Sequence, residues 1–207
     1  MAAGTAAQPH GRAGRHLVVP VVMLGAALLV AVPAVLAAQE PTVVILVRHA
    51  EKAAEPANDP PLTPAGEARA AALAAALREA RVSGIVSTQF RRTLETAAPL
   101  ARGLGLTPDT VRAGGQSAAQ HAQAVAAHVR DRYAGRTVLV VGHSNTIPPI
   151  IAALGGPRMP DLCDPEYAHL FVLVLRADGT ASLVDSTVGA ADPPSAPDCR
   201  RTTRQGP

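Results

Sequence analysis

Apolar runs that end in charged or polar residues are the clearest pattern in this chain. Val43 to Val47 are all β-branched or aliphatic, which predicts a strand buried on both faces, and Arg48 and His49 follow directly. A second run, Thr137 to Val141, leads in the same way to His143. Ligands of open α/β sheets bind at the carboxyl ends of the strands. We therefore expect both histidines at one edge of one sheet.

Helical and strand patterns alternate around these two runs. Thr63 and Pro64 form a helix start, with Thr as N-cap and Pro in the first turn, and Ser117 with Gln120 forms a capping box. The remaining predicted helices and strands are helices 64–81, 90–102, 117–133 and 147–154 and strands 84–87, 106–111, 170–175 and 181–184. Strands separated by helices imply βαβ units. The predicted fold class is α/β, a three-layer α/β/α sandwich with a mostly parallel sheet.

Three segments of different composition divide the 207 residues. Residues 1–38 contain two early arginines and then an apolar, uncharged stretch from Leu17 to Ala38 that ends in small residues, as in a cleavable signal peptide. A stretch of about 20 apolar residues is also long enough to be a membrane anchor. Residues 39–189 form the predicted globular domain, and residues 190–207 a Pro-rich tail. Both interpretations place the domain outside the cytoplasm, in the periplasm or extracellular, and a membrane is a partner only if the segment stays uncleaved.

Composition narrows the choice of partners. The net charge is only +3, and two Tyr, two Phe and no Trp leave no aromatic set for stacking bases, so nucleic acid is not an expected partner. The two cysteines, Cys163 and Cys199, are a plausible disulfide in an oxidising compartment, tying the tail to the loop near Cys163. Two unrelated free thiols are the alternative.

The candidate chemistry comes from two arginines and two histidines. Arginine recognises tetrahedral oxyanions through paired, charge-assisted hydrogen bonds, and a neutral histidine nitrogen is a nucleophile. Arg48, His49 and His143 follow the two main strands, and the segment 88–96 adds further arginines. The set suggests a phosphoryl group held for attack. A divalent cation is disfavoured beside arginines, and no Cys cluster or His-x-x-x-His pair is present, so no metal and no cofactor are expected.

Four motifs together are specific enough to indicate a family. They are residues 46–51 (Leu-Val-Arg-His-Ala-Glu), 61–68 (Pro-Leu-Thr-Pro-Ala-Gly-Glu-Ala), 88–96 and 140–144 (Val-Val-Gly-His-Ser). With them the chain resembles the histidine phosphatase superfamily, also called phosphoglycerate mutase-like, and its shorter branch, over about residues 42–185.

The resemblance implies roles for particular residues. His49 would be the phosphorylated nucleophile and, with His143, catalytic; Arg48, Arg92 and His143 would bind the phosphate and stabilise the transferring group. Arg92 is preferred to Arg91 because the family pattern places a threonine four residues after the arginine, which Thr96 satisfies.

The chain also departs from the family pattern. Ala50 replaces the usual glycine after the histidine, and the proton donor is not identifiable, with Glu51, Asp59 and Asp109 as candidates. The expected function is that of an exported, metal-independent phosphomonoesterase, a phosphoric monoester hydrolase, working through a phosphohistidine. Its partner would be a small phosphorylated substrate or a phosphoprotein. The alternative is a catalytically silent phosphate-binding or interaction domain of the same fold.

Overall fold

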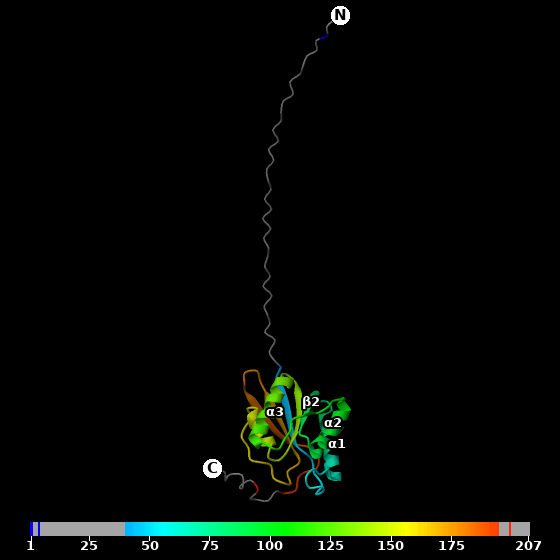
Figure 1. The fold of residues 1–207 in the computed structure, drawn as a ribbon, viewed down its shortest axis with the longest axis vertical. Coiled ribbons are helices and arrows are strands. Elements are labelled where there is room, and N and C mark those ends of the chain that lie inside the picture. The colour runs from blue at the N-terminus through cyan, green and yellow to red at the C-terminus, as the bar shows by residue number, and fades with distance from the viewer. Residues whose placement is uncertain (2–3, 5–39, 195–198, 200–207) are drawn as a thin grey trace. The chain divides into compact units, whose positions relative to one another are not determined.

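The computed structural model describes residues 40–194 together with Met1, Gly4 and Cys199. The predicted signal or anchor segment and most of the Pro-rich tail lie outside these residues. Figure 1 colours the chain by residue number from the N-terminus to the C-terminus, and the elements follow in that order. They are β1 (Thr42–Arg48), α1 (Pro64–Leu77), β2 (Val82–Ser87), α2 (Arg91–Leu104), β3 (Asp109–Thr110), α3 (Ala118–Tyr133), β4 (Thr137–Gly142), α4 (Ile147–Ala153), β5 (His169–Leu175) and β6 (Ala181–Thr187).

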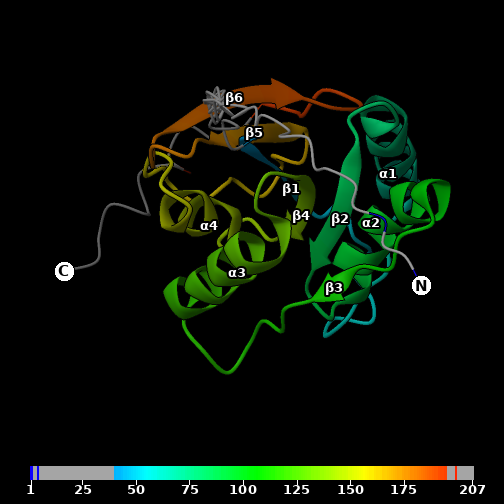
Figure 2. The ribbon, with the colours of Figure 1, turned by 90° about the horizontal axis from the view of Figure 1, so that it is seen from above.

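One six-stranded sheet carries the domain, in the order β3-β2-β4-β1-β5-β6. The pairs from β3 to β1 are parallel, and only β5 runs against the others, because it is antiparallel to both β1 and β6. Helices α1 and α2 cover one face of the sheet, and α3 and α4 cover the other (Figure 2). The prediction of an α/β fold with a mostly parallel sheet is confirmed.

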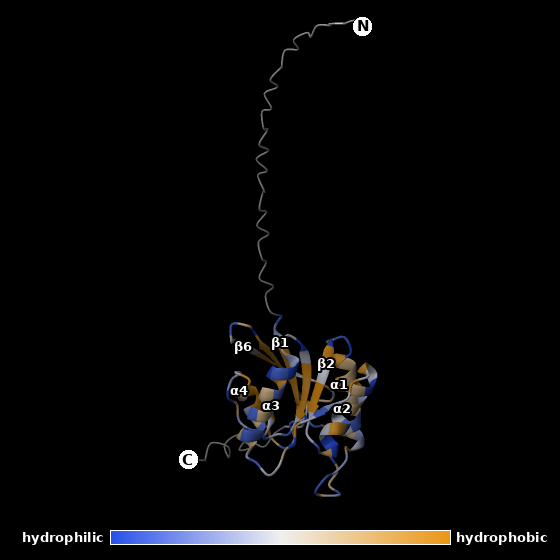
Figure 3. Ribbon diagram, turned by 45° about the horizontal axis from the view of Figure 1, so that its top comes forward, coloured by the Kyte–Doolittle hydropathy of each residue, from blue (hydrophilic) through white to orange (hydrophobic). Residues whose placement is uncertain are grey.

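The two central strands, β1 and β4, have apolar side chains on both faces. The ribbon of the sheet interior accordingly has mostly the hydrophobic colour in Figure 3. In β1, Val44 and Leu46 pack in the cluster under α3 and α4, whereas Ile45 and Val47 pack in the cluster under α1 and α2. This double burial is the physical reason why the run has no polar alternation. It also makes the sheet a rigid support for the residues that follow its strands.

Helix α1 begins where its sequence signals place it. Thr63 caps the helix by accepting a hydrogen bond from the Gly66 amide at 3.2 Å, and its own amide donates to the Glu51 carbonyl at 2.9 Å. A Cβ at Gly66 would overlap that same carbonyl oxygen, so glycine is required for this close approach. The first turn of α1 therefore packs directly on the segment that follows His49.

Several predicted boundaries are wrong in detail. The first helix ends at Leu77 rather than 81, because Arg81 has a positive φ of 53° and β2 begins at once with Val82. The expected strand 106–111 is only Asp109–Thr110, at the sheet edge, since pairing with β2 is limited to two residues. The last strand continues to Thr187 because it pairs with β5 along its whole length.

The disulfide prediction is confirmed. Cys163 is bonded to Cys199, with 5.9 Å between the Cα atoms, and the alternative of two free thiols is wrong. Over the described part of the chain, every helix is too short or too polar to cross a lipid bilayer.

Candidate functional site

The site forms where β1, β4 and β2 end side by side. Arg48 pairs with Gly142 in register, and the His49 amide donates to the Gly142 carbonyl at 2.9 Å, which extends the ladder by one residue. The rings of His49 and His143 consequently lie edge to face, with 5.4 Å between their centroids. The structure therefore brings together the two histidines that the sequence placed on separate strands.

His49 is held as a neutral ring with a defined tautomer. Its Nδ1 lies 2.8 Å from the Ala50 carbonyl oxygen, and because a carbonyl can only accept, Nδ1 carries the proton. Burial lowers the pKa of His49 to about 4; the hydrogen bond to Ala50 opposes this shift, and the positive charges of Arg48 and Arg92 add to it. Nε2 is then an unprotonated nitrogen with an available lone pair at neutral pH.

His143 is also neutral at physiological pH. Burial lowers its pKa to about 3, and the charge of Arg92 acts in the same direction. Its Nε2 lies 3.2 Å from the Thr88 hydroxyl, and its ring meets the edge of Phe90 at 5.5 Å between centroids. The two uncharged imidazoles lie near the guanidinium groups of Arg48 and Arg92, whose positive charges lower the pKa of both rings.

Arg48 is fixed by a loop far away in the sequence. Its Nη1 donates to the carbonyl oxygens of Cys163 at 2.8 Å, Asp164 at 2.9 Å and Glu166 at 3.2 Å. The Tyr167 ring lies 4.0 Å from the guanidinium carbon, within cation–π distance. The side chain is almost entirely buried, and burial lowers the pKa of Arg48.

Arg92 has fewer protein partners. Its guanidinium carbon lies 4.4 Å from the Phe90 ring, and the described residues provide no hydrogen bond or ion pair to its side chain. The Nε atoms of Arg92 and Arg48 are both buried without a hydrogen-bond partner among the described residues. A buried donor without a partner is costly, so an oxyanion ligand would be stabilised here.

The three candidate proton donors differ in how they are bound. Glu51 forms a two-oxygen ion pair with Arg69; burial alone would raise the pKa of Glu51, but the hydrogen bonds from Arg69 outweigh it and lower the pKa. Asp109 accepts from Tyr133 and pairs with His128, each at 2.8 Å. Asp59 accepts from the Arg91 amide at 2.9 Å, and its charge acts on Arg92. The charge of Asp59 thus acts on Arg92, whereas the charge of Glu51 acts on Arg69 and Arg48.

Several residues of the site were not found from sequence. Thr96 accepts a hydrogen bond from the Ala50 amide at 2.9 Å and so fixes the turn after His49, a role that its place in the motif did not reveal. Thr88 bonds to Thr93 at 2.8 Å and to His143. Tyr167 has no recognisable motif around it. In the sequence, only the repeated threonines of segment 88–96 could have indicated these contacts.

A groove lies between α3, α4 and the loop after α4, and Asn145, two residues after His143 in the sequence, is part of its wall. Small and apolar side chains of α3, α4 and the next loop form most of its wall, with a few polar groups. Its lining includes Ala118, Ala122, Asn145, Pro148, Arg158 and Met159. Among the described residues, no group of three or more His, Cys, Asp or Glu side chains could hold a metal ion.

Comparison with known proteins adds a family to this geometry. Residues 44–114 match the histidine phosphatase superfamily (branch 1). The matched range contains Arg48, His49 and Arg92, whereas His143 lies beyond it. No curated protein sequence matches the chain.

Solved structures share the fold. YhfR from Bacillus stearothermophilus has a TM-score of 0.56 at 22% identity, and the alignment covers 69% of this chain and 95% of that one. The protein histidine phosphatase SixA, solved with tungstate, has a TM-score of 0.56 at 18% identity, covering 70% and 96%. A mycobacterial glucosyl-3-phosphoglycerate phosphatase, solved with inorganic phosphate, has a TM-score of 0.54 at 19% identity, covering 72% and 97%. At these identities the likeness establishes a common fold.

Proposed function

We propose that the chain is a member of the histidine phosphatase superfamily, whose model matches residues 44–114, and that it hydrolyses phosphate monoesters through a phosphate held covalently on His49. The observation that carries the proposal is the unprotonated Nε2 of His49 beside Arg48 and Arg92, whose buried Nε atoms have no hydrogen-bond partner among the described residues. The proposed nucleophile and the groups proposed to bind the oxyanion thus lie together, at the carboxyl ends of β1 and β4 and in the first turn of α2.

The reaction has two displacements. The lone pair of His49 Nε2 attacks phosphorus, the ester P–O bond breaks, and its electrons leave with the alcohol oxygen, which takes up a proton. Water then attacks phosphorus and gives a proton to the carboxylate left by the acid that protonated the alcohol, and the N–P bond electrons return to Nε2 as phosphate is released. Arg48, Arg92 and His143 hold the equatorial oxygens, whose charge is spread over them in the transition state.

Asp59 is the best candidate to supply the proton to the leaving alcohol. It is the candidate acid whose charge acts on Arg92, whereas Glu51 and Asp109 are each bound in their own ion pairs. A small phosphorylated substrate or a phosphoprotein side chain fits this proposal.

No metal is required in this scheme. The guanidinium groups of Arg48 and Arg92 do the work that a divalent cation does in metal phosphatases, and their charge would repel such a cation. Turnover should survive treatment with a chelator, and a large loss reversed by zinc or magnesium would contradict metal independence. Export is part of the proposal and rests on the apolar stretch from Leu17 to Ala38. N-terminal sequencing of the mature protein tests it.

The decisive experiment traps the intermediate. Wild-type protein is quenched in alkali during turnover, because phosphohistidine survives alkali and is destroyed by acid, and the peptide containing His49 is analysed by mass spectrometry. His49→Ala should abolish the adduct and reduce turnover by several orders of magnitude, on the order of the 10⁶-fold seen when a nucleophile is removed elsewhere. Wild-type turnover in His49→Ala would reject His49 as nucleophile. Binding of phosphate without any labelling or turnover would favour the silent-domain alternative.

A further inference from the structure

Arg48 is held by the loop 163–167, and this loop is itself held by the segment that follows β6. We propose that Asp192 is a positioning residue for Arg48: it fixes the loop whose carbonyl oxygens orient the guanidinium group, and so sets the affinity of the site for phosphate. This inference rests on the proposed function, since it concerns the phosphate-binding arginine of the same site.

The first link is the contact between Arg48 and the loop. Three backbone carbonyls, those of Cys163, Asp164 and Glu166, converge on one nitrogen, Nη1. The ring of Tyr167 covers the guanidinium group from one side. A backbone carbonyl cannot adjust independently of its neighbours, so the direction of Arg48 depends on the conformation of the whole loop.

The second link is the contact between the loop and Asp192. One carboxylate accepts the amide of Tyr167 at 2.9 Å and the amide of Ala168 at 3.0 Å and 2.9 Å. These two amides lie at the junction between the loop and β5. Charged acceptors form the stronger class of hydrogen bond, and two adjacent amides on one carboxylate fix the peptide plane between them. The residue that covers Arg48 is therefore anchored through its own backbone.

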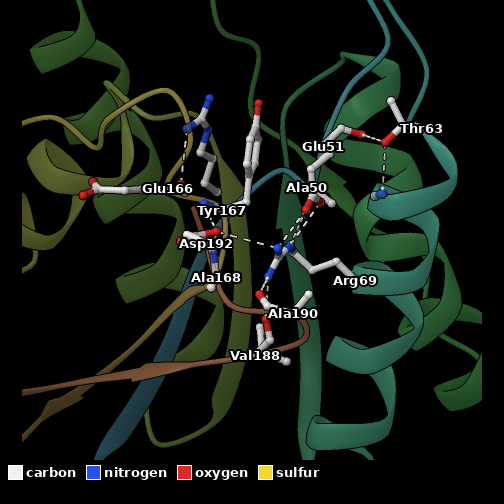
Figure 4. Close-up of polar contacts among 12 residues, drawn as sticks. Ala50, Glu51, Thr63, Arg69, Glu166, Tyr167, Ala168, Val188, Ala190 and Asp192 are labelled. Carbon is white, nitrogen blue, oxygen red and sulfur yellow. Dashed lines mark hydrogen bonds and ion pairs between the residues drawn. The ribbon is translucent and has the colours of Figure 1, made fainter. Parts of the chain in front are cut away.

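The third link holds Asp192 in place. Arg69 of α1 is only 6% exposed, and its Nη1 donates to the carbonyls of Val188 at 2.7 Å and Ala190 at 2.9 Å. Its Nη2 lies 3.6 Å from an Asp192 oxygen and 2.7 Å from Glu51. Figure 4 shows Arg69 between Glu51 and the segment that carries Asp192. Arg69 thus joins the chain just after His49 to the chain that fixes the loop.

The charge of Asp192 reaches Arg48 as well. Burial lowers the pKa of Arg48, and the negative charges of nearby groups, Asp192 among them, oppose that shift. Asp192 therefore contributes both geometry and charge to a buried cation. Truncation of Asp192 should loosen Arg48 without removing any atom that touches the phosphate.

The experiment compares Asp192→Ala and Asp192→Asn with Asp185→Ala in the full chain. Asp185 is a matched control, because it also pairs with a partner, His169 at 2.9 Å, but on the outer hairpin. The dissociation constant of inorganic phosphate is measured by calorimetry and kcat and KM with an aryl phosphate. Asp192→Ala should weaken phosphate binding about tenfold, which corresponds to about 1.4 kcal/mol. Asp192→Asn, which keeps an oxygen for the amides, should lose less, and Asp185→Ala should change binding less than twofold.

A double-mutant cycle with Arg48→Ala tests whether Asp192 acts through Arg48. In that background Asp192→Ala should cause no further loss of phosphate affinity. A full tenfold loss that persists without Arg48 would overturn the inference. So would wild-type affinity in a folded Asp192→Ala protein.

A second measurement does not depend on phosphate. Hydrogen exchange at Arg48 Nε, followed by NMR, should become at least about tenfold faster in Asp192→Ala, because local opening of the loop exposes the buried group. Exchange at Arg92 Nε should not change. Unchanged exchange at Arg48 would reject the positioning role. Failure of the wild type to bind phosphate, with exchange altered as expected, would instead reject the proposed function alone.

Discussion

The two arginines beside His49 are held in opposite ways. Arg48 is the last residue of the central strand β1 and donates to carbonyls 115, 116 and 118 residues away in the sequence. Arg92 lies in the first turn of α2 and rests on Phe90, two residues before it, with no hydrogen bond from the described residues to its side chain. The guanidinium group of Arg48 is therefore held by long-range contacts, whereas that of Arg92 contacts a residue close to it in the sequence.

This difference separates two requirements of an oxyanion site. A preorganised donor costs no reorganisation when the transition state forms, and Arg48 meets that requirement through its loop. A donor with few protein partners keeps its hydrogen-bonding capacity for the ligand, and Arg92 meets that one. We infer that loss of Arg48 harms folding and activity together, whereas loss of Arg92 harms activity alone.

The largest effect is expected from Arg48→Ala. Catalytic efficiency should fall about 10²–10³-fold or more, as for removal of a transition-state donor. The free energy of unfolding should also fall, by about 3 kcal/mol, because three carbonyls of the loop 163–167 lose their buried donor. Kinetics and urea unfolding of the same preparation measure both. If Arg48→Ala has the free energy of unfolding of the wild type, then Arg48 does not stabilise the fold and the two arginines do not differ in that respect.

Arg92→Ala should reduce kcat/KM by about 10²-fold and leave the free energy of unfolding within about 0.5 kcal/mol of wild type. The free energy of unfolding should hardly change, because the side chain forms no hydrogen bond with the described residues and the substitution removes a buried Nε donor that has no partner among them. Phosphate should raise the melting temperature of the wild type but hardly that of Arg92→Ala. A stability loss as large as that of Arg48→Ala would show that both arginines are structural.

The smallest effect concerns protonation. Both histidines have lowered pKa values, about 4 for His49 and about 3 for His143, so both should remain neutral as pH falls from 8 to 5.5 and His49 should lose its lone pair only near pH 4.

Removing a nearby positive charge raises a histidine pKa. After burial, the largest lowering charge on His143 is Arg92, whereas on His49 it is Arg48. Arg92→Ala should therefore raise the pKa of His143 more than Arg48→Ala does, and His49 should show the reverse order, as measured by NMR titration of the ring protons. If the two variants change the pKa of each histidine equally, then Arg48 and Arg92 do not differ in their electrostatic effect on the two rings.

The central strands and the helix starts follow from local sequence alone. The runs that form β1 and β4 are apolar without interruption, as burial on both faces requires, and each is followed by a histidine. The Ser117–Gln120 capping box forms as predicted, because its two hydrogen bonds join residues three apart. Ends of elements were less predictable: β3 is shorter than its pattern, since its length depends on how far β2 can pair with it.

The residues that orient Arg48 were decided only by the tertiary structure. Its three acceptors are backbone carbonyls, which every residue has, so no residue type marks them in the sequence. Tyr167 and Asp192 are both more than a hundred residues from Arg48 in the sequence. Tyr167 reaches Arg48 because β5 pairs with β1, and Asp192 reaches the Tyr167 amide because the chain after β6 returns to Arg69. Sequence alone therefore predicted which groups would perform the proposed chemistry, through strand pattern and motif. The folded chain determined how these groups are held, because long-range contacts depend on strand pairing and not on local preference.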